Sequence, residues 1–174
     1  VDKGLAYYMP MLFRFNGSYY TKGYAPVNVA MITVSPMGPH GYFSYGLTNC
    51  CMQEMLDAAD HIILEVNENM PVVFGMEADH IHITDVDYVV ENNVPLGTAP
   101  GAPAGEIDRA IANNIFPYLY DGITLQIGIG GMPNAVGTLI AQSDLKDLGV
   151  HTEMYVDAFV DIANAGKITG AKKS

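Results

Sequence analysis

The amino-acid sequence predicts an α/β protein with a mostly parallel sheet and flanking helices. Short apolar, β-branched runs alternate with segments whose apolar residues recur at helical spacing, which is the pattern of βαβ units. The runs are mostly apolar, as expected of parallel strands. A proline- and glycine-rich stretch divides this pattern in two. A domain boundary is therefore expected within this stretch.

The first half of the chain predicts a βαβ unit. Residues 27–34 (VNVAMITV) form a buried strand that a Ser-Pro pair ends. Residues 48–59 follow a loop and form a helix, capped at Thr48 or Asn49. The apolar residues of this helix share one face: Met52, Met55, Leu56 and Ala59. Residues 61–66 (HIILEV) form the second strand, which we expect to run parallel to the first.

The middle of the chain is less regular. Residues 80–90 carry alternating apolar side chains and predict an edge strand. Residues 92–105 hold three prolines and three glycines, which is the composition of a linker. We therefore predict a domain boundary here, with residues 1–91 before it and residues 106–174 after it.

The regular pattern returns after the linker. Residues 106–120 predict a helix with one apolar face, formed by Ile107, Ala110, Ile111 and Ile115. The remaining elements are a strand at 123–127, a glycine-rich turn at 128–131, a helix at 132–141, a strand at 150–156 and a helix at 157–165. Pro133 fits the first turn of its helix, where a missing N–H costs nothing. Gly166 fits a left-handed cap that ends the last helix.

Composition and charge exclude several classes of function. The chain has 174 residues, of which 19 are acidic and 8 basic, so the formal net charge is −11. This charge works against binding nucleic acid or an anionic membrane. No apolar run approaches the roughly 20 residues that cross a bilayer. Cys50 and Cys51 are adjacent, so they form neither a disulfide framework nor a metal-site spacing. We expect a cytoplasmic protein without nucleic-acid or membrane partners.

The glycine-rich turn Gly128-Ile129-Gly130-Gly131 is the first candidate site. Glycines let the backbone approach a ligand, and the helix that follows offers unpaired N–H groups to an anion. A dinucleotide fingerprint would need Gly or Ala where Pro133 stands, and the Gly-Lys-Ser/Thr of a Walker loop is absent. From the pattern alone, a structural glycine cluster and a ligand site fit equally well.

Glu153 is the second candidate. It lies 25 residues after Gly128, on the next predicted strand. The carboxyl ends of neighbouring parallel strands face one crevice, so this carboxylate can meet the glycine turn. The alternative is a surface glutamate that is solvated or paired, and position alone favours that alternative.

Longer stretches around these residues resemble a known family. Residues 126–136 (QIGIGGMPNAV) and 148–154 (LGVHTEM) are similar to segments of the acetyl-CoA hydrolase/transferase family, the family I coenzyme A transferases. The resemblance is strongest to its butyryl-CoA:acetate and 4-hydroxybutyrate CoA-transferases. Residues 34–46 (VSPMGPHGYFSYG), 65–71 (EVNENMP) and 80–87 (HIHITDVD) also resemble family segments. Order and spacing are kept over nearly the whole chain, which no single motif could achieve.

The resemblance implies a CoA-transferase-like fold, in which residues 1–91 are the C-terminal part of the first domain and residues 106–174 are the N-terminal part of the second, catalytic domain. It also names site residues. It implies that Glu153 is the catalytic nucleophile. It assigns four residues to the oxyanion and CoA site: Gln126, Gly128, Gly130 and Gly131. It makes four others candidates for the substrate pocket: His40, Tyr42, Met132 and Asn134. The implied substrates are a short-chain acyl-CoA (butyryl-, acetyl- or 4-hydroxybutyryl-CoA) and a carboxylic acid such as acetate. Coenzyme A is then a substrate, and neither a cofactor nor a metal is expected.

In the implied chemistry, a glutamate carboxylate attacks the acyl-CoA thioester and is converted into a glutamyl-CoA thioester. Two alternatives stay open. One is an acyl-CoA hydrolase on the same fold, in which water resolves the intermediate. The other is a non-catalytic nucleotide-binding module, in which the turn binds a phosphate and Glu153 binds a ribose hydroxyl.

The family's chains are much longer than this one. The sequence begins Val1-Asp2-Lys3 without a methionine, so we expect a piece of a longer polypeptide. This piece is expected to be inactive or nearly so when isolated, and the full-length protein is expected to be a homo-oligomer.

Two further groups of residues have functional alternatives. His80 and His82 share one face of a strand, a spacing that suits a zinc or iron site. We favour ordinary polar positions, or a lining of the substrate entrance. Cys50 and Cys51 begin a predicted helix, whose dipole would lower a thiol pKa. We favour a role as small buried hydrophobic residues.

Overall fold

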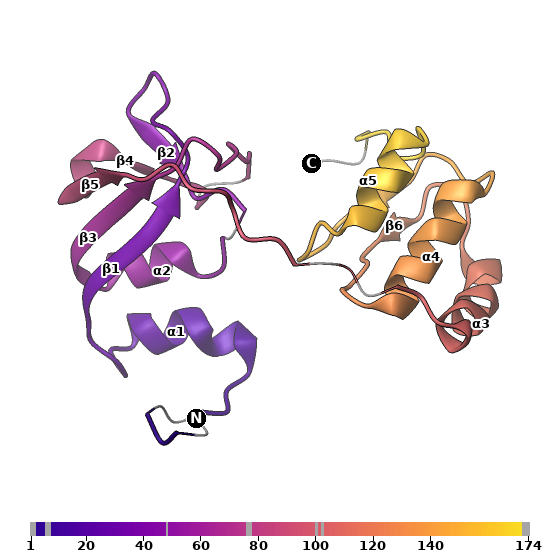
Figure 1. The fold of residues 1–174 in the computed structure, drawn as a ribbon, viewed down its shortest axis with the longest axis horizontal. Coiled ribbons are helices and arrows are strands. Elements are labelled where there is room, and N and C mark those ends of the chain that lie inside the picture. The colour runs from indigo at the N-terminus through magenta and orange to yellow at the C-terminus, as the bar shows by residue number, and fades with distance from the viewer. Residues whose placement is uncertain are drawn as a thin grey trace. The chain divides into compact units, whose positions relative to one another are not determined.

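The chain folds into two units, Val1–Gly97 and Thr98–Ser174, and each has its own hydrophobic core (Figure 1). The boundary lies inside the stretch 92–105. The computed structural model describes residues 3–5, 8–47, 49–75, 78–99, 101 and 103–171.

A parallel sheet in the order β1–β3–β5 forms the centre of the first unit (Figure 1). Strand β1 spans Val27–Val34, β3 spans Ala59–Val66 and β5 spans Tyr88–Glu91. Both strand pairs are parallel. The predicted bounds of β1 are confirmed, and β3 begins two residues before the predicted strand. The predicted βαβ unit is therefore confirmed.

The core of the first unit lies on one face of this sheet. Ala30, Ile32 and Val34 of β1 are buried there with Leu64 of β3. Helix α2 (Met52–Asp57) covers them through its predicted apolar face. On the opposite face of β1, Val29 and Met31 are exposed and Thr33 is half-buried, so the expectation of a fully buried strand is wrong for this face.

Helix α2 begins four residues later than predicted. Its N-cap is Cys51, which adopts the left-handed conformation (φ 48°) and makes no side-chain cap. Asn49 does not cap the helix, because its amide donates to the carbonyl of Ala78 at 2.6 Å. Thr48 lies outside the described residues. One hydrogen bond from the Asn49 side chain to distant backbone therefore takes the place of the predicted local cap.

The cysteines at this helix start are free and half-buried. Burial and the neighbouring Cys50 raise the pKa of the Cys51 thiol, although Asn16 donates a hydrogen bond to its sulfur at 2.9 Å. The helix dipole therefore does not produce a reactive thiolate at Cys51. Asn16 begins α1 (Asn16–Thr21), which follows the short helix η1 (Phe13–Phe15); neither was predicted from the sequence.

Residues 80–90 do not form one strand. Strand β4 (His80–His82) pairs antiparallel with β2 (Tyr42–Ser44), and the short helix η2 (Ile83–Asp85) separates it from β5. The imidazole Nδ1 of His82 accepts the backbone N–H of Thr84, which favours a turn over a strand. Asp87 then accepts the N–H of Ile62 at 2.8 Å and fixes β5 beside β3.

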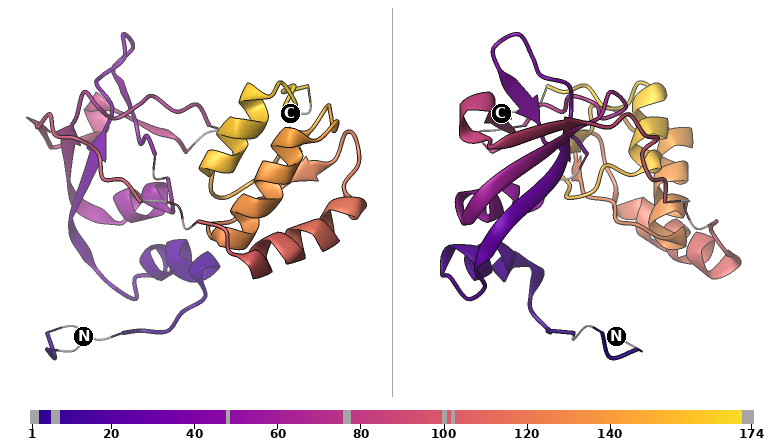
Figure 2. Two further views of the ribbon diagram at one scale, coloured as in Figure 1. Left: turned by 45° about the vertical axis from the view of Figure 1, so that its right-hand side comes forward. Right: turned by 60° about the vertical axis from the view of Figure 1, so that its left-hand side comes forward.

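Among the described residues, the second unit contains two parallel strands and three α-helices, of which α4 packs against both α3 and α5 (Figure 2). Its elements are α3 (Glu106–Ile115), η3 (Phe116–Tyr118), β6 (Thr124–Leu125), α4 (Gly131–Gln142), β7 (Gly149–Val150) and α5 (Asp157–Asn164). The strands are much shorter than predicted. Their core contains Ile140, Leu148, Phe159 and Ile162.

Gly166 ends α5 as predicted, with a positive φ of 71°. Its N–H donates to the carbonyl of Ala163 at 2.8 Å, and the N–H of Lys167 donates to that of Ile162 at 3.2 Å. This pair of bonds is a Schellman motif. In the part of the chain that the structure describes, no helix combines the length and apolarity needed to span a bilayer.

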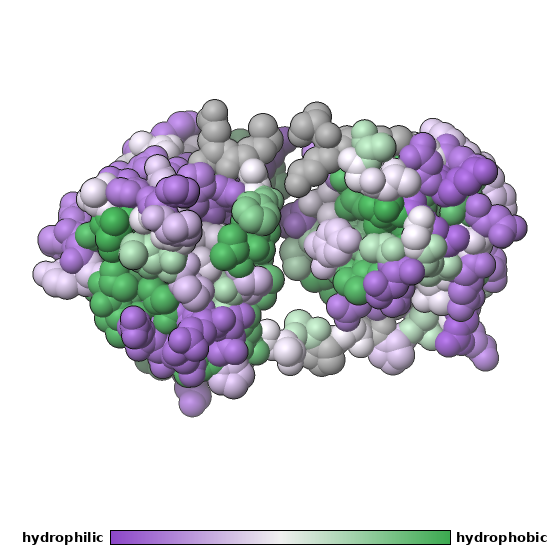
Figure 3. All heavy atoms as spheres, turned by 90° about the horizontal axis from the view of Figure 1, so that it is seen from above, coloured by the Kyte–Doolittle hydropathy of each residue, from purple (hydrophilic) through white to green (hydrophobic). Residues whose placement is uncertain are grey.

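The predicted apolar face of α3 is not buried within the second unit. Ile107 and Ile111 are 76% and 41% exposed, and Ala110 is exposed as well. Helix α3 instead buries Ala112, which lines a groove together with the buried Ala135 of α4. Small side chains allow the two helices to approach closely, so the alanine side of α3 faces α4 and the isoleucine side does not. Apolar side chains interrupt the hydrophilic surface of both units (Figure 3).

Glu65 should make the first unit sensitive to acid. The amide of Asn92 and the hydroxyl of Thr33 each donate to its carboxylate at 2.6 Å, and they lower the pKa of Glu65 below its usual 4.5. The folded state therefore binds this proton more weakly than the unfolded state. The stabilisation is present above about pH 4.5 and is lost as the pH falls through the lowered pKa.

We expect the difference in unfolding free energy between wild type and Glu65→Gln to shrink as the pH falls from 7 to 3. Urea denaturation at each pH measures it. Glu91→Gln is the control, because the carboxylate of Glu91 accepts no hydrogen bond from the described residues. A wild-type to Glu65→Gln difference that is constant with pH would contradict the prediction.

Candidate active site

Two loops leave the same edge of the sheet in the second unit. Strands β6 and β7 are parallel, with Thr124 opposite Gly149 and Leu125 opposite Val150. The N–H of His151 still donates to the carbonyl of Leu125 at 3.0 Å, and the loops separate beyond this bond. The carboxyl ends of parallel strands are where α/β proteins bind ligands. The two loops, residues 126–130 and 151–156, therefore form a candidate site.

The three glycines at the first loop and the start of α4 occupy their positions for different structural reasons. Gly130 is the N-cap of α4 and has a φ of 138°, which L side chains rarely adopt. A Cβ on Gly131 would lie 2.5 Å from Oδ2 of Asp108 and 3.2 Å from the carbonyl oxygen of Pro103, so a side chain there would displace Asp108. Gly128 has neither a positive φ nor an atom within 4 Å of such a Cβ. The fold explains Gly130 and Gly131, and it leaves the backbone at Gly128 open to a ligand.

Helix α4 begins directly at this turn, with Pro133 in its first turn as predicted. The N–H of Asn134 donates to the carbonyl of Gly130 at 3.1 Å, and Pro133 has no N–H. The N–H groups of Gly131 and Met132 precede the first intrahelical bond and are the donors available to an anion. Met132 and Asn134 are half-buried in this turn, and Gln126 is exposed in the loop before it.

Glu153 lies in the second loop and not on a strand. Strand β7 ends at Val150, and the hydroxyl of Thr152 donates to the carbonyl of Met154 at 2.9 Å, which bends the chain across Glu153. After the bend, the ring of Tyr155 stacks on the buried Phe159 with ring centroids 5.3 Å apart. The loop is therefore anchored on both sides, while Glu153 itself is exposed.

The helices that follow the two loops touch at one glycine. Gly137 of α4 and Ala158 of α5 are both buried, and a Cβ on Gly137 would lie 2.4 Å from the Cβ of Ala158. Figure 2 shows the two helices side by side. Helix α5 begins four residues after Glu153, and α4 begins at the glycine turn. This contact therefore fixes the helices whose first turns carry the candidate site.

His40 and Tyr42 belong to the first unit. His40 is exposed in the turn before β2, and Tyr42 is the first residue of that strand. The ring of Tyr42 packs edge-on against His80 and His82, with centroids 4.8 and 4.7 Å away. We call these three residues the ring cluster. A pocket of about 240 Å³ beside it is lined by Tyr42, His80 and Phe74 among others.

The sequence did not connect Tyr42 with the two histidines, because β2 and β4 are far apart in the chain and no local pattern marks their pairing. Asp79 contacts Nδ1 of His80. Burial raises the pKa of Asp79, but this contact and the N–H of Gly75 lower it by more. Among the described residues, no three His, Cys, Asp or Glu side chains are arranged to hold a metal ion.

Comparison with known proteins decides the family. Residues 1–97 match the family model described as the acetyl-CoA hydrolase/transferase N-terminal domain. The chain belongs to the acetyl-CoA hydrolase/transferase family. It is 49% identical to the butyryl-CoA:acetate CoA-transferase of Anaerostipes caccae, over 100% of this chain and 40% of that protein. It is also 49% identical to the probable butyrate:acetyl-CoA coenzyme A-transferase of Syntrophomonas wolfei, over 100% of this chain and 39% of that one.

The crystal structure of RipA from Yersinia pestis matches 99% of the chain and 40% of RipA, with a TM-score of 0.88 and 36% identity. This match confirms the predicted α/β fold class. Acetyl-CoA hydrolases also match; that of Neurospora crassa is 27% identical over 86% of this chain and 36% of its own. The chain spans about 40% of the length of the two curated CoA-transferases named above.

Gly137→Ala should destabilise the second unit. Overpacking against Ala158 costs typically about 1–3 kcal/mol, and alanine recovers up to about 1 kcal/mol through its helix propensity. We expect a net loss of about 1 kcal/mol in unfolding free energy by urea denaturation. Ala158→Gly should restore stability in the double variant. Thr138→Ala, at an exposed position of the same helix, should change it by less than about 0.5 kcal/mol. A Gly137→Ala chain as stable as wild type would contradict the close contact.

Proposed function

We propose that Glu153 is the nucleophile of a coenzyme A transferase that moves CoA from a short-chain acyl-CoA to a carboxylic acid such as acetate. One observation carries the proposal. The loop that carries the exposed carboxylate of Glu153 follows β7, and the glycine turn that begins α4 follows β6, so both lie at the same edge of the sheet. The substrate class is supported by relatives named as butyryl-CoA:acetate and butyrate:acetyl-CoA transferases.

In the proposed reaction, a carboxylate oxygen of Glu153 attacks the carbonyl carbon of the acyl-CoA thioester. The carbon–sulfur bond breaks, CoA leaves as a thiolate, and an anhydride joins Glu153 to the acyl group. The thiolate then attacks the glutamyl carbonyl carbon. The carbon–oxygen bond of the anhydride breaks, the first acid leaves as a carboxylate, and a glutamyl-CoA thioester remains. The acceptor carboxylate runs these steps in reverse, with no net proton transfer.

Each addition step places negative charge on a carbonyl oxygen. The N–H groups of Gly131 and Met132 are suited to receive it, because Pro133 has no N–H and that of Asn134 is bonded. The open backbone at Gly128 leaves room for the thioester. Removing one donor of this kind typically lowers kcat by about 10²–10³-fold. In this scheme CoA is a substrate, and the residues of the site need no cofactor or metal.

A hydrolase is the second candidate. The 27%-identical relative from Neurospora crassa is named as an acetyl-CoA hydrolase, and the exposure of Glu153 lets water reach an intermediate formed there. The third interpretation, a nucleotide-binding module, is disfavoured by Pro133 in the turn. Stabilisation of the protein by NAD but not by acyl-CoA would favour it. The homo-oligomeric state and the cytoplasmic location of the full-length protein stay predictions.

A CoA adduct on Glu153 is the main expected outcome. Residues 1–174 would replace the matched segment of the Anaerostipes caccae enzyme, to give a full-length chimera. We expect intact mass and peptide mapping to find CoA on Glu153 after incubation with butyryl-CoA and no acid. Glu153→Gln should lose the adduct and lower kcat by at least about 10³-fold, because the nucleophile is removed. Glu106→Gln, an exposed glutamate of α3, is the matched control and should keep both.

The dependence on acceptor acid separates the two reactions. A transferase should consume butyryl-CoA catalytically only when acetate is present, and acetyl-CoA should appear in equal amount. Steady hydrolysis without acetate would favour the hydrolase. A stable adduct on a residue other than Glu153 would overturn the assignment of the nucleophile.

A further inference from the structure

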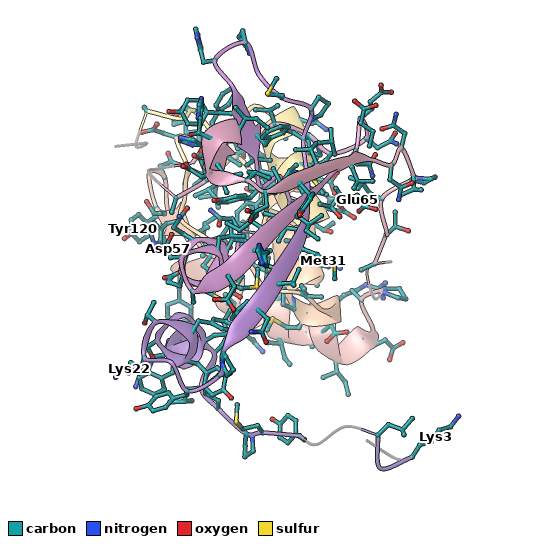
Figure 4. All side chains as sticks on the ribbon, turned by 90° about the vertical axis from the view of Figure 1, so that its left-hand side faces the viewer. Lys3, Lys22, Met31, Asp57, Glu65 and Tyr120 are labelled. Carbon is teal, nitrogen blue, oxygen red and sulfur yellow. The ribbon has the colours of Figure 1, made fainter. Side chains whose placement is uncertain are left out.

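The parallel sheet of the first unit has one open face. We define the outer face by the side chains that β1, β3 and β5 present away from the buried core. The register places Met31, Ile63 and Tyr88 in one row and Thr33, Glu65 and Val90 in the next. Met31 is 73% exposed, Tyr88 62% and Val90 53%. Figure 4 shows Met31 and Glu65 on the side of the sheet away from Asp57 of α2.

An open, apolar face is unusual for this kind of sheet. Parallel sheets occur almost only with both faces covered, because their crossover connections place helices on each side. Large exposed apolar patches on folded proteins mark contact surfaces. The outer face also contains a hollow of about 300 Å³, lined by Met31, Ile63, Glu65 and Val90 among others. The outer face therefore has the composition and the shape of an interface.

Glu65 defines the charge that the occupant must carry. Among the described residues, the carboxylate of Glu65 accepts hydrogen bonds only from the neutral side chains of Asn92 and Thr33. No basic side chain of the described residues forms an ion pair with Glu65. The basic group nearest in register on this face, His61, lies 3.7 Å from the carboxylate of Asp87 instead. When a covering element removes a carboxylate from water, the carboxylate needs a cation as its partner. A guanidinium group suits it best, because it can bond both oxygens.

We propose that the outer face docks an amphipathic α-helix that packs apolar residues on Met31, Ile63 and Val90 and pairs an arginine or lysine with Glu65. A helix is the element that covers parallel sheets. The helix comes from the part of the family's sequence that lies outside the matched segment, since the chain spans about 40% of its curated relatives. The proposal rests on family membership and on the sheet, and it is independent of the proposed reaction.

Cysteine labelling tests the docking without any assay of activity. Met31→Cys, in a chain with Cys50 and Cys51 changed to serine, would react with a maleimide in the 174-residue chain and in the full-length chimera. We expect labelling at least tenfold slower in the chimera. Lys22→Cys, at an exposed polar position after α1, should react equally fast in both. Equal rates for Met31→Cys in the two proteins would overturn the proposal.

Two further readouts identify the occupant. A photocrosslinker attached at Met31→Cys should capture a chimera peptide from outside residues 1–174 that contains Arg or Lys. Glu65→Gln should lower the melting temperature of the chimera more than that of the 174-residue chain, whereas Glu91→Gln should change both by equal, small amounts. A captured peptide without a basic residue would overturn the proposal. The proposal would also be overturned if Met31→Cys were protected from labelling in the 174-residue chain and this protection disappeared on dilution, because a second copy of the chain would then be the occupant.

If the chimera is insoluble, the 174-residue chain can be co-expressed with the remaining part of the Anaerostipes caccae enzyme. Protection of Met31→Cys in that complex supports the proposal, and full reactivity overturns it.

Discussion

The contact between Gly137 and Ala158 is the constraint on which the candidate site depends. Each of the two helices continues directly from a loop at the carboxyl end of β6 or β7, so the spacing of their first turns follows from how closely their bodies pack. Ile140, Phe159 and Ile162 fill the space around the contact and are fully buried. The strand pair contributes only two residues on each side. Helix packing, more than the sheet, therefore holds the glycine turn and the loop of Glu153 in register.

The elements that the sequence predicts well are those whose signal is local. The β-branched run of β1, the apolar face of α2, the turn before α4 and the cap at Gly166 each follow from residues close together in the chain. The failures share a different cause. Asp87 bonds to Ile62 and places β5 next to β3, and Asn49 bonds to Ala78 and gives up its role as a cap. Such bonds link distant segments, so periodicity contains no trace of them.

The candidate site shows the same division. Gly128 and Glu153 could be singled out because a strand–turn–helix pattern and a resemblance to a family mark them, and the structure places both at one sheet edge. The bend that takes Glu153 off the strand could not be predicted, since it involves a single hydrogen bond from the Thr152 hydroxyl to the carbonyl of Met154. The ring cluster was missed because it needs the pairing of β2 with β4. The identity of a residue indicates the chemistry it can perform, whereas tertiary contacts determine where that residue lies.

Two surfaces look buried in the sequence and are exposed in the structure: the outer face of the first unit and the isoleucine side of α3. The pattern is the same on both. Apolar side chains recur at the period of their element, yet no described residue of the unit to which each surface belongs covers them. Each Å² of apolar surface that stays exposed at Met31 or Ile107 loses roughly 25 cal/mol of stabilising free energy from hydrophobic burial. A periodic apolar face without a cover therefore indicates a contact surface, because hydrophobic periodicity reflects the assembly in which the side chains are buried.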